Sequence, residues 1–279
     1  MERKIFTPSD AFFPIVQRPV HIFNHYDDHS GFEEIPNRMA IVNDTNNAVL
    51  GIVSKNYVPV LNEEVYNLFI DTLSEYKIKD PIHHLDIDGR KWSCDFILDD
   101  PDTNYDIAGR GDIVSVAIRA FNAYNGKNTF GYEIFGFRSM CENGMIFGKQ
   151  SLFVQAFRHF VGKSKKLLEH FRLHFGLFRE NVELWQVWAK EEFNRQEFLE
   201  FLSHRDYLGE RLEYELIGLF DNEYAKDGTC TIWDAYNLLT YVSTHKTQLK
   251  QNVSGIFGNK YRTVSHLVED FYKDYQRAA

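Results

Sequence analysis

The stretch IVSVAIRAFNAYNGKNTFGYEIFGFRSMC, residues 113–141, contains the clearest secondary-structure signal in the chain. Two apolar runs, 113–124 and 127–141, flank Asn125-Gly126, the dipeptide that most strongly favours a tight β-hairpin. If the loop contains only these two residues, the numbers of facing residues sum to 251. Phe121 then faces Phe130, Arg119 faces Tyr132, and all four side chains share one face of the ribbon.

Further strands are expected on both sides of this hairpin in the N-terminal half. Residues 39–43 and 48–53 flank a turn-rich segment, and residues 82–87 and 91–98 flank Asp88-Gly89, a second hairpin signal. A helix is expected over residues 63–76, where apolar residues recur at helical spacing. Residues 1–37 contain several prolines and read as an irregular lead-in with short extended pieces.

The period of the apolar residues changes near residue 150. From Phe153 to Phe178 large apolar residues step by three or four, which predicts one long amphipathic helix. Further helices are expected at about 180–202, 206–221, 231–250 and 261–276. The sequence therefore predicts an α+β fold, in which an antiparallel, hairpin-rich sheet packs with long amphipathic helices from the C-terminal half. We expect a single domain over 38–279, sheet-rich over 38–148 and helical over 149–279, with one shared core.

The charge, the cysteine content and the absence of long apolar runs limit the cellular compartment and the kinds of structural site that are expected. The chain has a net charge of −9 and three widely spaced cysteines, so neither a disulfide framework nor a structural zinc site is expected. No signal peptide and no long apolar run are apparent, which favours a cytoplasmic protein that does not span a membrane.

The positive charge of the chain is concentrated in one segment. Residues 138–179 hold eight basic and two acidic side chains, a net charge of +6, so the rest of the chain carries −15. A basic helix in an acidic protein is typical of a polyanion site, and aromatic rings beside it would suit base stacking. The candidate nucleic-acid-binding residues are Arg119, Phe121, Phe130, Tyr132, Arg138, Lys149, Arg158, Lys163, Lys165, Lys166 and Arg172.

Each part of this candidate site also has a purely structural interpretation. The lysines could form the solvated face of a core helix, and Phe121 and Phe130 could be a buried cross-strand pair. Arg138 could pair with a buried acid such as Glu133, and Cys141 could be a small core residue.

No nucleotide-binding loop, zinc-protease motif or hydrolase nucleophile motif occurs in the sequence. His84, Asp86 and Asp88 would share one face of a strand and could hold a divalent metal in a nuclease. The alternative is a solvated strand edge before a turn. We expect no catalytic residues, no bound metal and no cofactor.

Four short motifs resemble a family catalogued as domain of unknown function 932. Arg138-Ser-Met-Cys141-Glu-Asn143-Gly144 after the hairpin resembles its Arg-x-x-Cys-x-Asn-Gly core. Segments 54–62, 89–92 and 233–245, the last with Asn237 and His245, resemble other parts of it. The resemblance spans about residues 38–250 and implies an accessory protein of a phage or plasmid, in the host cytoplasm if phage-encoded. The order of hairpin sheet and basic helix also resembles Rad-fifty-two-type annealing proteins, by architecture alone.

These observations together favour a non-catalytic protein that binds single-stranded DNA in replication or recombination and forms a homo-oligomer. Two alternatives stay open. One is a metal-dependent nuclease that uses the acids near residues 84–106. The other is an interaction factor whose acidic surface contacts a host protein or defence system.

Overall fold

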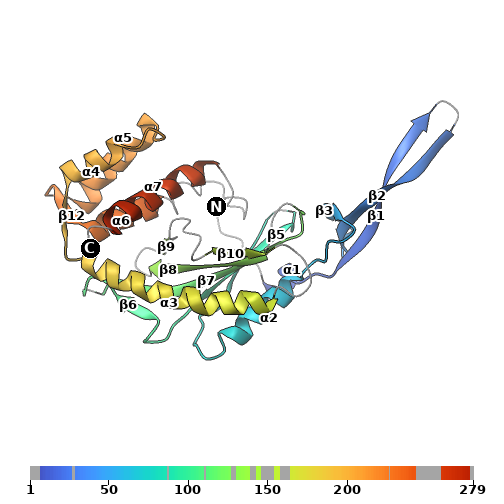
Figure 1. Ribbon diagram of the computed structural model, residues 1–279, viewed down its shortest axis with the longest axis horizontal. Coiled ribbons are helices and arrows are strands. Elements are labelled where there is room, and N and C mark those ends of the chain that lie inside the picture. Colours follow the sequence, from blue (N-terminus) through green and yellow to red (C-terminus); the bar gives the residue numbers. More distant parts are fainter. Residues whose placement is uncertain are drawn as a thin grey trace.

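The structure is a computed structural model that describes residues 7–26, 29–86, 88–109, 111–126, 130–138, 143–145, 154–157, 164–225, 227–242 and 259–276. It is a mixed α+β protein, with antiparallel sheets in the N-terminal half and helices mostly in the C-terminal half (Figure 1), which confirms the predicted fold class. The strands are β1 Ile15–Tyr26, β2 His29–Asn43, β3 Val49–Ser54, β4 Ile82–Leu85, β5 Lys91–Ile97, β6 Asn104–Asp106, β7 Ile113–Ala123, β8 Phe130–Arg138, β9 Asn143–Met145, β10 Val154–Phe157, β11 Glu192–Asn194 and β12 Thr229–Thr231. The helices are α1 Pro8–Ala11, α2 Asn62–Thr72, α3 Ser164–Trp188, α4 Arg195–Ser203, α5 Glu210–Leu219, a π-turn Phe220–Tyr224, α6 Ile232–Tyr241 and α7 Asn259–Gln276.

The central sheet has seven strands, with the order β10-β8-β7-β5-β4 and with β6 and β9 paired to β7 and β8. Alternation along β5 works as the sequence predicts, because Trp92, Cys94 and Phe96 enter the core on one face. Ser93 and Asp95 point to the other face and are buried as well. The sheet is therefore covered on both sides at β5, and its second face carries polar groups that need partners.

The register of the β7–β8 hairpin differs from the prediction. Facing residues sum to 252, so Arg119 lies opposite Glu133 and Ala120 lies opposite Tyr132. The loop is longer than Asn125-Gly126, since β7 ends at Ala123 and β8 begins at Phe130. A one-residue change of register moves every side chain of one strand to the other face. The prediction that Arg119, Phe121, Phe130 and Tyr132 share a face is therefore wrong.

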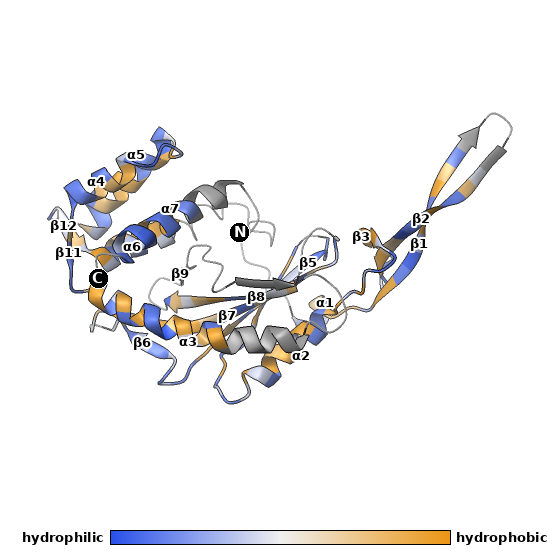
Figure 2. Cartoon of the chain, viewed as in Figure 1, coloured by the Kyte–Doolittle hydropathy of each residue, from blue (hydrophilic) through white to orange (hydrophobic). Residues whose placement is uncertain are grey.

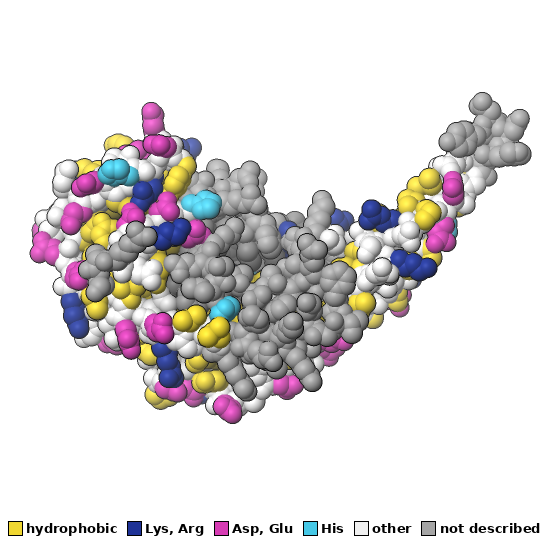
Figure 3. Space-filling model, viewed as in Figure 1, with side chains coloured by type: hydrophobic (Ala, Val, Ile, Leu, Met, Phe, Trp, Pro, Cys, Tyr) yellow, Lys and Arg dark blue, Asp and Glu magenta, His cyan; other side chains and the backbone are white. Residues whose placement is uncertain are grey.

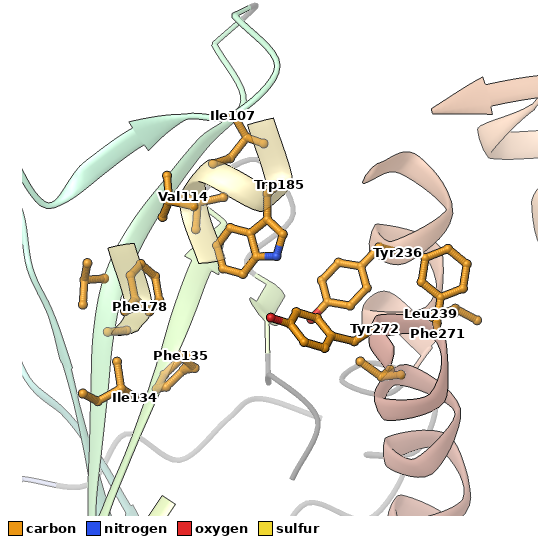
Figure 4. Packing of buried hydrophobic residues seen from close by; sticks show 14 of the residues in the cluster. Ile107, Val114, Ile134, Phe135, Phe178, Trp185, Tyr236, Leu239, Phe271 and Tyr272 are labelled. Carbon is orange, nitrogen blue, oxygen red and sulfur yellow. The ribbon is translucent and has the colours of Figure 1, made fainter. Parts of the chain in front are cut away.

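Helices α2 and α3 cover the apolar face of the sheet, and α6 and α7 lie on the far side of the molecule from α2 (Figure 1). Phe69 of α2 contacts the rings of Phe96 and Tyr132. The C-terminal half of α3 meets α6, where the Trp185 and Trp233 ring centroids are 5.4 Å apart. Figure 4 shows Trp185 between the sheet residues and the α6 and α7 residues, and Figure 2 shows hydrophobic segments within α3 and β8. One core thus contains residues from both halves of the chain.

The helical half confirms most of the expected elements but not their bounds. Residues 154–157 form strand β10 beside β8 rather than the start of the long helix. That helix, α3, begins at Ser164 and runs to Trp188, and α4 begins only at Arg195, so the expected break near residue 180 is wrong. Asn194 caps α4, and its side chain accepts a hydrogen bond from the backbone N–H of Glu197.

A long β-ribbon replaces most of the expected irregular lead-in. Strands β1 and β2 pair from Ile15–Asn43 out to Tyr26–His29, with a register shift after Pro19. In Figure 1 the ribbon projects away from the rest of the molecule. At the base of the ribbon, Ile41 packs in a small hydrophobic cluster with Leu50 and Val53 of β3 and with Tyr124 of the β7–β8 loop.

The contact between β3 and the β7–β8 loop gives a stability test. A Cβ atom at Gly51 would overlap the carbonyl oxygen of Tyr124 and lie 2.7 Å from the Cα of Asn125. We predict that Gly51→Ala lowers the free energy of unfolding by about 1–3 kcal/mol, because backbone must move. Gly176→Ala is the matched control, since α3 leaves open space there. It should raise stability by about 0.5–1 kcal/mol. Urea denaturation of both variants measures this, and equal midpoints would contradict it.

Candidate nucleic-acid interface

Two of the four aromatic and arginine residues expected on the ribbon face are buried in the core. Phe130 is buried, and so is the whole side chain of Tyr132. The Tyr132 hydroxyl lies 2.9 Å from Nδ1 of His174 on α3, and burial raises the pKa of Tyr132 well above its usual range. These rings fix α3 to the sheet and are not accessible for stacking on bases.

Arg119 lies on the opposite face of the sheet and is held by a carboxylate. Its Nε and Nη2 donate to the two oxygens of Asp95 on β5, at 2.6 and 2.8 Å. The guanidinium carbon also lies 5.2 Å from the centre of the Phe135 ring. Phe121, two residues further along β7, is half-buried on the same face. The guanidinium group of Arg119 thus links β7 to β5 through a bidentate ion pair. A phosphate would bind the same two N–H groups in the same geometry.

Asp95 is the centre of a polar row that crosses the sheet. Strand pairing places Asp95 opposite Arg119, and Arg119 opposite Glu133. Nε2 of His84, on the edge strand β4, lies 3.1 Å from the second oxygen of Asp95. Burial alone would raise the pKa of Asp95, but the ion pair and hydrogen bonds with Arg119 outweigh it and hold the pKa well below its usual range. Asp95 is therefore an anion at neutral pH.

Arg138, the first residue of the Arg-x-x-Cys-x-Asn-Gly motif, forms a second carboxylate pair. Its partner is Asp112, just before β7, and not Glu133: Nε bonds one oxygen, and Nη2 donates to the other at 2.8 Å. The indole N–H of Trp233 on α6 donates to the same Asp112 carboxylate at 2.9 Å. This cluster ties the end of the hairpin to the C-terminal helices, which gives Arg138 a structural role.

The remaining predicted residues lie in or before α3. Lys149, Arg158 and Lys163 fall outside the described residues. Lys165, Lys166 and Arg172 lie in α3, where the structure describes the backbone. Further along the helix, His174, Phe178 and Trp185 are buried, whereas Leu173 and Arg179 are exposed.

Helical periodicity relates these positions to one another. Positions 165, 172 and 179 are seven residues apart and follow one stripe of the helix. The stripe is about 200° around the axis from His174, two residues after Arg172, and so lies opposite the buried side. We call positions 165, 172 and 179 the cationic stripe. Positions 165 and 172 belong to the predicted interface, and Arg179, which was not among the predicted residues, is exposed.

Comparison with known families agrees with the motifs. The family model "domain of unknown function (DUF932)" matches residues 49–268, most of the chain. The chain belongs to this family. No curated protein and no solved structure matches it. The matched region starts at Val49, the first residue of β3, so β1 and β2 lie outside it.

The three residues weighed as a possible metal site have other partners in this DUF932 chain. Nε2 of His84 lies 3.1 Å from an oxygen of Asp95, and Asp86 accepts a hydrogen bond from the backbone N–H of Lys91. A carboxylate oxygen of Asp88 lies 3.6 Å from Nε of Arg90. Among the described residues, no group of three or more His, Cys, Asp or Glu side chains is placed to bind a metal ion.

Other family motif residues are only partly described. Cys141 and His245 fall outside the described residues. Asn237 on α6 is buried, and neither polar atom of its side-chain amide has a hydrogen-bond partner among the described residues. Within the part of the chain that the structure describes, no helix is both long and apolar enough to cross a membrane.

We predict that removing the carboxylate of the Asp95–Arg119 pair destabilises the fold more than removing that of an exposed ion pair. Asp95→Ala removes the bidentate partner of a largely buried guanidinium and should cost about 3–5 kcal/mol of unfolding free energy at neutral pH. Asp221→Ala is the matched control, because Asp221 accepts two similar bonds from Arg195 at an exposed site. It should cost less than about 1 kcal/mol. Urea denaturation distinguishes them.

The same pair sets a pH dependence. Because the pKa of Asp95 is lowered in the folded protein, its stabilising effect is complete above the unfolded pKa of about 3.9 and is lost as pH falls towards the folded pKa. The stability difference between the natural chain and Asp95→Ala should be constant from about pH 7 to 5 and should shrink below about pH 4. A difference that does not depend on pH would contradict this account.

Proposed function

We propose that this DUF932 chain is a non-catalytic protein that binds single-stranded nucleic acid through the cationic stripe of α3, during replication or recombination of a phage or plasmid. The observation that supports the proposal is the charge of α3. Residues 164–179 contain Lys165, Lys166, Arg172 and Arg179 against one acid, Glu169, a net charge of +3. The stripe lies on the side of the helix opposite to its buried residues.

The acidic remainder of the chain restricts where a polyanion can approach. With −15 outside residues 138–179, most of the surface repels phosphate, and contact is favourable only along the basic segment. Phosphate contacts release counterions, so the affinity should fall steeply as salt rises. Such binding follows the backbone and has little dependence on base sequence.

The proposal does not include stacking of nucleic-acid bases on the aromatic rings of the β7–β8 hairpin, which the sequence had suggested. Phe130 and Tyr132 are buried, and Arg119 and Arg138 are engaged by Asp95 and Asp112. Of the residues expected on the ribbon face, Phe121 and Arg119 keep partial exposure, and Arg119 is the one that Asp95 engages. The proposal therefore rests on charge, and the affinity for a neutral backbone analogue should be low.

A triple substitution tests the stripe. Lys165→Ala/Arg172→Ala/Arg179→Ala should weaken binding of a labelled single-stranded oligonucleotide, and the slope of log affinity against log salt should flatten by about 2, since each lost contact removes about 0.7. Fluorescence anisotropy at several salt concentrations measures both quantities.

The matched control removes three exposed cations elsewhere: Lys55, Lys190 and Arg211. The control variant has the same net charge as the stripe variant. It should retain the salt slope of the natural chain. Equal losses in the two variants would attribute binding to overall charge, and absence of binding by the natural chain at low salt would reject the proposed function.

A further inference from the structure

The distal part of the β1–β2 ribbon exposes apolar side chains on a thin, unsupported element. Phe23 and Phe32 face each other across the strands with ring centroids 5.2 Å apart, and they are 58% and 77% exposed. Ile22, on the other face, is exposed as well. A two-stranded ribbon solvated on both faces is marginally stable in water. Its length and its apolar pair indicate an element that is stabilised by a contact outside its own chain.

The charge of the ribbon limits the kind of partner. Residues 20–37 contain four acids, Asp27, Asp28, Glu33 and Glu34, and no lysine or arginine. Nucleic acid and an anionic membrane would both be repelled by this charge. Figure 3 shows hydrophobic and acidic side chains next to each other on the outer part of the ribbon, with Lys or Arg side chains nearer the body of the molecule. A fitting partner surface combines positive charge with an exposed apolar group.

The chain itself offers such a surface. On α3, Leu173 is 61% exposed; basic position 166 lies nearly in line with it along the helix, and positions 165, 172 and 179 lie about 100° to one side. The ribbon projects away from the α3 helix of its own chain (Figure 1). We propose that the ribbon of one copy docks on α3 of a second copy, with the Phe23–Phe32 pair on Leu173 and the ribbon acids near the α3 cations.

This contact joins two different surfaces, so it is heterologous. A heterologous contact leaves a free ribbon on one copy and a free α3 surface on the other, and further copies add until a ring closes or an open chain forms. The ribbon lies outside the matched family region, so self-association would be a property added to the DUF932 body. It does not rest on the proposed function, although nucleic acid would compete with the ribbon for the same helix.

Two variants and their mixture test the proposal. The ribbon variant is Phe32→Ser/Glu34→Lys, and the helix variant is Leu173→Asp/Arg179→Glu. All four positions are exposed, so each variant should keep the unfolding midpoint of the natural chain. By light scattering without nucleic acid, the natural chain should be oligomeric and each variant monomeric. A one-to-one mixture should form a dimer, because each mixed pair retains one intact ribbon and one intact helix.

Tyr214→Ser is the control, because Tyr214 is 82% exposed on α5 and its replacement should leave the oligomer unchanged. Three outcomes would overturn the proposal. They are a monomeric natural chain at low salt, a helix variant that stays oligomeric because ribbons pair with ribbons, and a mixture that remains monomeric. If the natural chain is oligomeric but does not bind the oligonucleotide, the proposed function is rejected and the docking proposal stands.

Discussion

The register of the β7–β8 hairpin is the constraint on which the rest of the structure depends. With Arg119 opposite Glu133 and Ala120 opposite Tyr132, the two faces of the sheet receive different chemistry. Tyr132 enters the apolar face and meets His174, which positions α3. Arg119 enters the other face and meets Asp95. A shift of β8 by one residue would leave Arg119 in place but would put the Tyr132 ring among the carboxylates and the Glu133 carboxylate in the apolar core, at a cost of several kcal/mol.

Carboxylates then decide which cations remain available for function. Asp95 and Asp112 each hold one arginine of the hairpin in a bidentate pair, and Asp112 also accepts the indole N–H of Trp233 from α6. These pairs join strand to strand and the hairpin to the C-terminal helices. They also engage the guanidinium groups of both hairpin arginines, which are therefore not presented to a phosphate.

Much of the fold could be predicted from the sequence, because alternation in β5 and helical spacing in α2, α3 and α7 are strong local signals. The register could not, since the Asn125-Gly126 signal fits both a two-residue loop and a longer one. The β1–β2 ribbon was not predicted, because Pro19 and Pro36 argue against regular strands. The structure places both prolines at the register shift, where prolines are tolerated. The start of α4 did have a signal, the Asn194–Glu197 capping box. The partners of Arg119 and Arg138 depend on register and tertiary packing, so no local pattern identifies them.

Cross-strand backbone NOEs in an isotopically labelled sample test the register most directly. The account predicts NOEs that connect facing residues whose numbers sum to 252, such as Arg119 with Glu133 and Ala117 with Phe135. A set of NOEs that connects Arg119 with Tyr132 instead would place the arginine and the aromatic rings on one face. That result would contradict both the buried position of Tyr132 and the assignment of Arg119 to Asp95.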